Sequence, residues 1–284
     1  MRFGQKTTRV SASKCTDMSP PRNKIIQLIL GDQSVNLLLN EKRVLITGAS
    51  KGIGYATALS FAREGALPVM VARNLEMLEK AASNIMDETG VNPELICLDL
   101  TSSGSAVTLF EAVGPVDILV NNAGSIPGGN LSQVDEARWR AAWELKVYGY
   151  INLTRMWLPS MSKRGSGVIA NVIGMAGVAH RNAYICGTAA NAALIAFTNA
   201  VGSSSSHQGV RVFGVNPGQT RTERIITLEK NTPGALSSGV AFGRPMEPSE
   251  VADFIVFGCS TKASYLSGTV INLDGGQQYA GQKT

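Results

Sequence analysis

From residue 43 onward, short apolar runs alternate with longer segments whose apolar residues recur every three or four positions. Apolar runs rich in Val and Ile are typical of buried strands, and the longer period is typical of amphipathic helices. The apolar runs predict strands at residues 43–47, 68–72, 94–98, 116–120, 167–173, 210–215 and 270–273. The periodic segments predict helices at residues 53–63, 75–87, 105–112, 136–160, 184–204 and 248–257. Alternating strands and helices favour an α/β fold with a doubly wound, parallel, seven-stranded sheet and helices on both faces.

The alternating pattern continues without an internal repeat or a Pro/Gly-rich linker, which indicates a single domain over residues 39–284. Two of the helices, at residues 136–160 and 184–204, are unusually long and flank the fifth strand. Residues 222–244 contain scattered Gly, Ser and Pro, which is typical of a mobile loop. Residues 1–38 precede the pattern and are interpreted as a basic, disordered extension.

The net charge of +5 lies entirely at the start of the chain, where residues 1–30 hold six basic residues and one acidic residue. The rest of the chain is neutral, so the charge gives little reason to expect a nucleic-acid partner. The basic leader loosely resembles an organelle transit peptide without a well-shaped amphipathic helix. We therefore expect a cytoplasmic protein, with organelle targeting left open. The apolar patches at residues 25–30 and 35–39 are too short to span a membrane, and no membrane partner is expected.

Side chains that bind metals or act as thiol nucleophiles are few and scattered. The chain has four cysteines and two histidines: Cys15, Cys97, Cys186, Cys259, His180 and His207. This spacing matches neither a metal-ligand pair nor a disulfide framework, and the histidines lack the companions of a zinc site or a Ser/His/Asp triad. We expect free thiols and no metal.

A glycine-rich string, TGASKGIG at residues 47–54, follows the first strand and opens a helix. Glycines allow the backbone to turn tightly and approach a pyrophosphate, and a helix N-terminus offers N–H groups and a positive dipole to the anion. The spacing differs from G-x-G-x-x-G, so the position between strand and helix carries the interpretation. The residues expected to contact a dinucleotide are Gly48, Ser50, Lys51, Gly52, Ile53 and Gly54.

The second strand ends with Arg73 and Asn74, where an NAD site normally places a carboxylate for the ribose hydroxyls. Arg73 can offer its guanidinium to a 2′-phosphate, and Lys51 can add a second positive charge. Two cations without an acid favour NADP(H) over NAD(H).

Five ordered motifs together resemble the short-chain dehydrogenase/reductase family, which has a Rossmann-type fold. They are residues 47–54, Asp99 with Leu100, residues 121–124 (NNAG), residues 216–222 (NPGQTRT) and residues 268–276 (GTVINLDGG). The resemblance covers about residues 40–277. It implies that Asp99 and Leu100 lie beside the adenine, that Asn122, Ala123 and Gly124 pack against the ribose side, and that Pro217, Gly218 and Thr220 line the nicotinamide pocket.

The catalytic pattern of that family is a tyrosine, a lysine four residues later, a serine at the end of the fifth strand and an asparagine on the preceding long helix. Tyr184 is assigned to the tyrosine position, but Thr188 stands where the lysine is expected. Gly174 takes the serine position, and Lys146 takes the asparagine position. A cation within about 4–6 Å favours a phenolate, so Lys146 can replace the missing lysine. The hypothesis is a rearranged site in which Tyr184 donates the proton and Lys146 is its electrostatic and ribose-holding partner.

The expected function is NADP(H)-dependent interconversion of a small-molecule carbonyl and a secondary alcohol by hydride transfer. The alternative is a catalytically inactive relative that binds the cofactor as a sensor or partner subunit, with Lys146 facing solvent or held in a salt bridge. By resemblance, the two long helices favour a homotetramer or homodimer. The sequence does not identify the substrate.

Overall fold

The computed structural model of the protein describes residues 35–223, 226 and 242–276. The chain divides into two units, residues 1–36 and residues 37–284, and the described helices and strands all belong to the second. Most of the expected basic extension at residues 1–38, and most of the expected loop at residues 222–244, lie outside the described residues.

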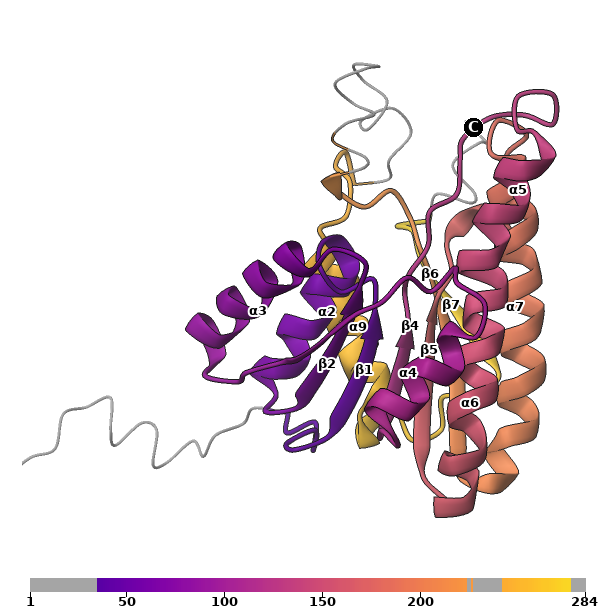
Figure 1. Ribbon diagram of the computed structural model, residues 1–284. Coiled ribbons are helices and arrows are strands. Elements are labelled where there is room, and N and C mark those ends of the chain that lie inside the picture. Colours follow the sequence, from indigo (N-terminus) through magenta and orange to yellow (C-terminus); the bar gives the residue numbers. More distant parts are fainter. Residues whose placement is uncertain (1–34, 224–225, 227–241, 277–284) are drawn as a thin grey trace, which may run out of the picture. The chain divides into compact units, whose positions relative to one another are not determined.

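Seven strands form one parallel sheet in the order β3-β2-β1-β4-β5-β6-β7 (Figure 1). The strands are β1 (Arg43–Thr47), β2 (Leu67–Ala72), β3 (Glu94–Cys97), β4 (Ile118–Asn121), β5 (Gly167–Val172), β6 (Val210–Pro217) and β7 (Thr269–Leu273). The order reverses between β1 and β4, and in open α/β sheets such a switch point opens a ligand-binding crevice at the carboxyl ends of the strands. The predicted fold class is confirmed.

Helices cover both faces of the sheet (Figure 1). One face carries α2 (Gly52–Arg63), α3 (Leu75–Thr89) and α9 (Pro248–Cys259), and the other carries α4 (Ser105–Val113), α6 (Gly149–Arg164) and α7 (Ile185–Ser205). Side chains along a strand alternate between the two cores. In β1, Val44 and Ile46 enter the core shared with α2 and α9, whereas Leu45 enters the core shared with α4 and α6.

The helix predicted at residues 136–160 is divided into three parts. It consists of α5 (Glu136–Trp143), a π-helical turn η1 (Glu144–Tyr148) and α6, which continues to Arg164. The hydrogen bonds of a π-helix join residues five apart rather than four, so the turn is wider and holds an extra residue. Such turns are frequent at functional sites. The apolar period alone did not predict it, and it contains Lys146.

The predicted strand ends differ by a few residues from those of the structure. Strand β6 runs to Pro217 rather than to residue 215, because Asn216 pairs with Asn272 and Pro217 with Leu273 across the sheet. The Asn216 side chain also donates to Asn272 Oδ1 at 2.9 Å. A buried polar pair therefore extends the ladder where the apolar run has already ended.

Candidate functional site

The turn between β1 and α2 requires glycine at several positions. Gly48 and Gly52 have φ angles of +66° and +57°, which L side chains rarely adopt. At Gly54 a Cβ would come 2.3 Å from Gly48 O and 2.5 Å from Asn122 Nδ2. The missing side chains let the helix start close to the strand and leave a cradle of main chain, which fits a pyrophosphate. Within this turn Ser50 is half-buried, and Ile53 packs against the core under α2.

The ends of β1 and β4 are held side by side at the switch point. The buried hydroxyl of Thr47 accepts hydrogen bonds from the main-chain N–H groups of Asn122 and Ala123, each at 3.0 Å. Asn122 Nδ2 returns a bond to Thr47 O at 2.9 Å. The structure thus brings the predicted residues 122–124 against the predicted glycine turn.

Helix α2 begins without a side-chain cap, because Lys51 at its N-cap has an extended backbone and makes no capping hydrogen bond. First-turn N–H groups without such a cap remain available to an anion. Lys51 Nζ instead lies 2.7 Å from Glu223 Oε2, and both side chains are exposed. A Cβ at Gly52 would lie 3.4 Å from Thr222 Cγ2, so the segment after β6 lies against the glycine turn.

Arg73 and Asp99, predicted separately, are neighbours at the carboxyl ends of β2 and β3. Arg73 Nη1 lies 3.9 Å from Asp99 Oδ2 in an exposed ion pair. The pKa of Asp99 is lowered mainly by the Thr101 N–H, which donates to its carboxylate at 2.9 Å, with smaller contributions from the Thr101 hydroxyl and from Arg73. A carboxylate therefore stands beside the guanidinium after all, although it comes from the segment that follows β3. Leu100, the next residue, is buried in the core under α4.

The segment after β6 presents main-chain groups and one unpaired amide oxygen. Gly218 N–H donates to Leu273 O at 2.8 Å, and the buried Thr220 hydroxyl donates to Gly218 O at 3.2 Å. These bonds fix Pro217, Gly218 and Thr220 in one tight turn. Gln219 Oε1 is buried and has no hydrogen-bond partner among the described residues. A ligand donor such as an amide N–H would satisfy this oxygen.

Lys146 points from the π-helical turn to the end of β5. Its Nζ donates to Ile173 O at 2.6 Å. Its alkyl chain crosses Gly124, where a Cβ would come 3.0 Å from Lys146 Cδ. The side chain is half-buried rather than fully exposed to solvent, and the ammonium lies at the carboxyl edge of the sheet.

Side chains from two elements hold the main chain of Gly174, directly after Ile173. Gly174 N–H donates to Asn216 Oδ1 of β6, and Gly174 O accepts from Asn191 Nδ2 of α7, each at 3.2 Å. Gly174 has a φ of +135°, and a Cβ there would lie 3.0 Å from Asn191 Nδ2. The position expected to hold a serine is therefore fitted to a glycine, and its N–H is used within the protein.

Tyr184 precedes the first residue of α7, and its main chain forms a bridge with Gly129. Its ring packs against a cluster that contains Val147, the residue after Lys146, so the two candidate catalytic residues lie on adjacent elements. Thr188 does not take the place of a lysine, because its hydroxyl bonds with Arg181 N and Arg181 O at 3.2 Å.

Asn191 is a site residue that the sequence interpretation did not name. It is 3% exposed, and its Oδ1 has no hydrogen-bond partner in the described part of the chain. The family spacing of four residues between tyrosine and lysine also separates Gly187 from Asn191. The interval between Gly174 and Tyr184 is a few residues shorter than is usual in the family, which is the sequence signal for a register three residues further along.

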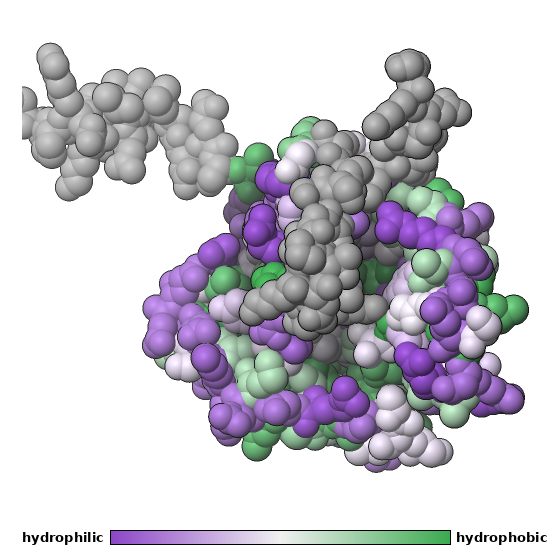
Figure 2. All heavy atoms as spheres, turned by 90° about the horizontal axis from the view of Figure 1, so that it is seen from above, coloured by the Kyte–Doolittle hydropathy of each residue, from purple (hydrophilic) through white to green (hydrophobic). Residues whose placement is uncertain are grey.

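The carboxyl edge is seen from above in Figure 2, with hydrophilic residues along the rim of the described surface and apolar residues among them.

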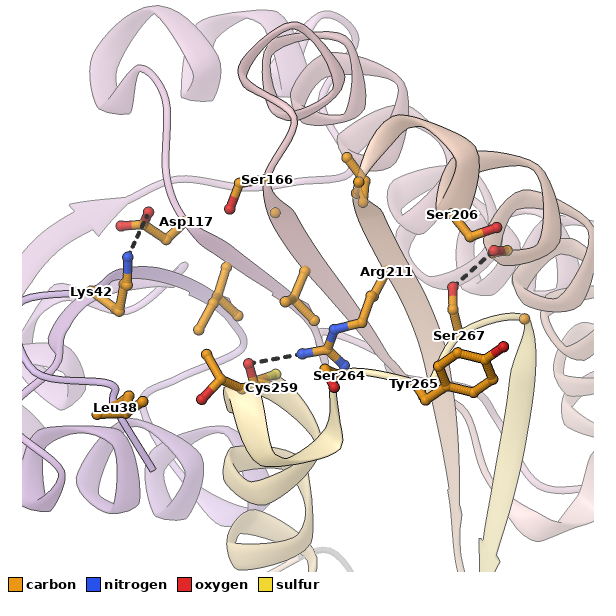
Figure 3. A pocket seen from close by; sticks show the side chains of 18 of the residues that line it. Leu38, Lys42, Asp117, Ser166, Ser206, Arg211, Cys259, Ser264, Tyr265 and Ser267 are labelled. Carbon is orange, nitrogen blue, oxygen red and sulfur yellow. Dashed lines mark hydrogen bonds and ion pairs between the residues drawn. The ribbon is translucent and has the colours of Figure 1, made fainter. Parts of the chain in front are cut away.

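A cavity of about 720 Å³ lies at the opposite edge, where β4, β5 and β6 begin (Figure 3). Arg211 in this cavity donates to the carbonyls of Gly258, Cys259 and Ser260, so its guanidinium holds the α9 terminus. Burial raises the pKa of the neighbouring Cys259 thiol to about 12.

In residues 35–223 and 242–276, no three acidic, cysteine or histidine side chains group as a metal site would need. The segment Ile185–Gln208 has the length and apolar composition of a membrane span. It includes α7, which packs against β6 and β7 as part of the α/β domain.

Comparison with known proteins agrees with this geometry. Residues 42–232 match the short chain dehydrogenase family. A 3-oxoacyl-(acyl-carrier-protein) reductase of Thermotoga maritima is 34% identical over 84% of this chain and 98% of its own length. A 2-keto-3-deoxy-L-fuconate dehydrogenase of Xanthomonas campestris is 30% identical over 96% of this chain and 92% of its own.

A solved structure has the same fold. The L-sorbose reductase of Gluconobacter frateurii, complexed with NADPH and L-sorbose, superposes with a TM-score of 0.79 at 30% identity, covering 86% of this chain and 99% of that one. The family match at residues 42–232 spans the glycine turn, the ends of the central strands and both long helices. The chain belongs to the short chain dehydrogenase family, and the expectation of an oxidoreductase with a dinucleotide-binding Rossmann-type domain is confirmed.

Proposed function

We propose that the protein is an NADP(H)-dependent oxidoreductase that interconverts a carbonyl and a secondary alcohol through a rearranged site. The observation that carries the proposal is the position of Lys146, whose ammonium lies 2.6 Å from Ile173 O at the carboxyl end of β5. This is the edge of the sheet at which the glycine turn and residues 122–124 meet.

The cofactor, when bound, supplies the hydride. The residues for its phosphates are the main chain of the glycine turn, Lys51 and Arg73, and a 2′-phosphate fits the two cations. Support comes from the NADPH bound to the L-sorbose reductase of similar structure. Glu223 and Asp99, which pair with these two cations, moderate the preference for NADP(H).

The protein's part in the reduction is to hold the carbonyl and to deliver one proton. Tyr184 donates its phenolic proton to the substrate oxygen, and in the reverse direction it takes the proton from the alcohol. A free tyrosine titrates near 10, so the phenolate needs a nearby positive charge at neutral pH. Lys146, on the element adjacent to Tyr184, supplies that charge.

The second candidate is an inactive relative that binds the cofactor without turnover. It is favoured by Gly174, which offers no hydroxyl and whose N–H and C=O groups are bonded to Asn216 and Asn191. In that case the site recognises a dinucleotide and serves as a sensor or partner subunit.

The experiment that separates these functions begins with calorimetric titration of the purified chain with NADPH and with NADH. Binding selective for NADPH supports the roles of Arg73 and Lys51. Consumption of NADPH is then followed with 3-oxoacyl thioesters and keto sugars, the classes named in its relatives, for the wild type, Tyr184→Phe and Lys146→Ala. Loss of at least 100-fold in both variants supports the rearranged enzyme. Full activity in either variant contradicts it, and cofactor binding without turnover of any carbonyl favours the inactive relative.

Two further properties belong to the proposal, a homodimer or homotetramer and a cytoplasmic location. The resemblance of the two long helices to those of the family supports the first. Light scattering of the purified chain measures it directly.

A further inference from the structure

The ring of Tyr184 fills the space that a side chain at position 187 would occupy. A Cβ on Gly187 would come 2.0 Å from Cε1 and 2.2 Å from Cζ of that ring. Carbon atoms that are not bonded lie about 3.5 Å apart or more, so the ring and a side chain at 187 exclude each other. Because Cζ carries the phenolic oxygen, it is the hydroxyl end of the ring that covers Gly187.

Gly187 is not explained by backbone conformation. It lies inside α7 and is not among the glycines with positive φ. In the interior of a helix, glycine is less favourable than alanine. The space taken by the Tyr184 ring is therefore the physical reason for a glycine at this position.

The covered face of α7 is the one that reaches the end of β5. Asn191 follows Gly187 by four residues, and residues four apart share a helix face. Asn191 Nδ2 donates to Gly174 O, next to the carbonyl that accepts from Lys146. The Tyr184 main chain is fixed from the other side, since Gly129 N–H donates to Ala183 O at 2.8 Å and Ile185 N–H donates to Gly129 O at 3.3 Å.

We infer that Gly187 is a positioning residue for Tyr184, an assignment that rests on the proposed role of Tyr184 as proton donor. Tyr184 lies three residues before Gly187 in the sequence. Because Gly187 has no side chain, the phenol ring of Tyr184 can lie over α7 in the space beside Gly187. The tyrosine and the glycine act as a pair, because a side chain at 187 would displace the ring.

The test uses fluorine NMR of the full chain labelled with 3-fluorotyrosine, with NADP⁺ as the added probe. The chain has six tyrosines, and Tyr184→Phe identifies the resonance of Tyr184. This readout reports the surroundings and the titration of one phenol and requires no known substrate. The compared variants are Gly187→Ala and the control Gly149→Ala, which places the same substitution in a helix where the nearest contact of the new Cβ is 3.6 Å.

We expect Gly187→Ala to shift the Tyr184 resonance in the free protein and to abolish its response to NADP⁺, with the other tyrosine resonances unchanged. Gly149→Ala should leave both properties as in the wild type. An unchanged Tyr184 resonance with an unchanged response in Gly187→Ala overturns the inference, whether or not the protein turns over a substrate.

Failure of the proposed function has a different result. If calorimetry shows that NADP⁺ binds but the Tyr184 resonance of the wild type does not change, Tyr184 is not the proton donor. The positioning role of Gly187 is then wrong as well, although Gly187→Ala still changes the packing of the ring. Where a carbonyl is turned over, Gly187→Ala should lower kcat at least tenfold in the wild type and should have no further effect in Tyr184→Phe. Equal losses in both backgrounds would show that Gly187 does not act through Tyr184.

Discussion

The carboxamide of Asn191 donates a hydrogen bond to the main-chain oxygen of Gly174 across 3.2 Å, joining α7 to the end of β5. Lys146 bonds the preceding carbonyl from the opposite helix, so two consecutive carbonyls of one strand end are held by side chains from two different helices. This arrangement fixes the backbone at the point where a substrate oxygen would approach.

Asn191→Ala removes this bond and leaves the half-buried Gly174 O without this partner. Loss of one partner of a buried hydrogen bond costs about 1–3 kcal/mol, so the midpoint of urea unfolding should fall accordingly. Ser203→Ala, an exposed position on the same helix, serves as the control and should change stability by less than about 0.5 kcal/mol. Equal midpoints for Asn191→Ala and the wild type would show that Asn191 does not stabilise this strand end.

Glu223→Gln should tighten the binding of NADPH. The carboxylate of Glu223 pairs with Lys51 Nζ at 2.7 Å, and the pair must loosen if Lys51 is to contact a phosphate. Exposed ion pairs contribute about 0–1 kcal/mol, so the gain in affinity should be at most about fivefold and should shrink at high salt. Calorimetric titrations at two salt concentrations measure it, and weaker binding in the variant would indicate that Glu223 supports the site instead.

Arg73→Ala should weaken the binding of NADPH much more than the binding of NADH. A guanidinium bonded to a phosphate contributes about 1.5–3 kcal/mol, which corresponds to a loss of roughly 10- to 100-fold for NADPH. Arg63→Ala, which removes an exposed and ion-paired arginine from α2, is the matched control. If the substitution weakens the binding of NADH and of NADPH equally, Arg73 does not contact the 2′-phosphate.

The ionised side chains at the start of α9 should make the stability of the fold depend on pH. Glu250 accepts from Glu247 N–H at 2.8 Å and pairs with Arg244 at 2.7 Å, and the arginine hydrogen bond is the main reason that the pKa of Glu250 is lowered to about 2. A lowered pKa contributes stability above about pH 4.3, the ordinary value for Glu, and this contribution is lost as the pH falls toward 2. Glu250→Gln should therefore lower Tm by about 2 °C at pH 7, with the difference from the wild type narrowing below pH 4. A difference that stays constant down to pH 3 would argue against the charge as its cause.

Much of the fold is predictable because the strands of a parallel sheet are buried on both faces. Each strand therefore appears in the sequence as a run of apolar residues. The glycine turn and the NNAG segment are predictable because their backbone demands glycine, as the contacts at Gly48 and Gly54 show. Lys51 and Arg73 remain predicted cofactor contacts, and their ion-pair partners Glu223 and Asp99 were not predicted. The contact of Lys51 with Glu223 joins residues 172 positions apart, and no local pattern records it.

The register on α7 illustrates a different limit. Gly187, Thr188 and Asn191 fall within two turns of one face of α7, directly after Tyr184, so periodicity cannot choose among them. The choice of Thr188 relied on counting from a tyrosine that lies outside the helix. Only the hydrogen bonds to Arg181 and Gly174 distinguish Thr188 from Asn191.

The π-helical turn at Glu144–Tyr148 has a consequence for how this site can change in evolution. Such a turn is an α-helix with one inserted residue, and each residue of an α-helix rotates the chain by about 100°. The wider turn takes up the extra residue, so α5 and α6 keep nearly the phase of one continuous α-helix. Deleting one residue here would close the turn with that phase kept, but it would change which side chain of the turn faces the end of β5. The length of this segment, as well as the identity of residue 146, therefore decides which group is presented to the strand end.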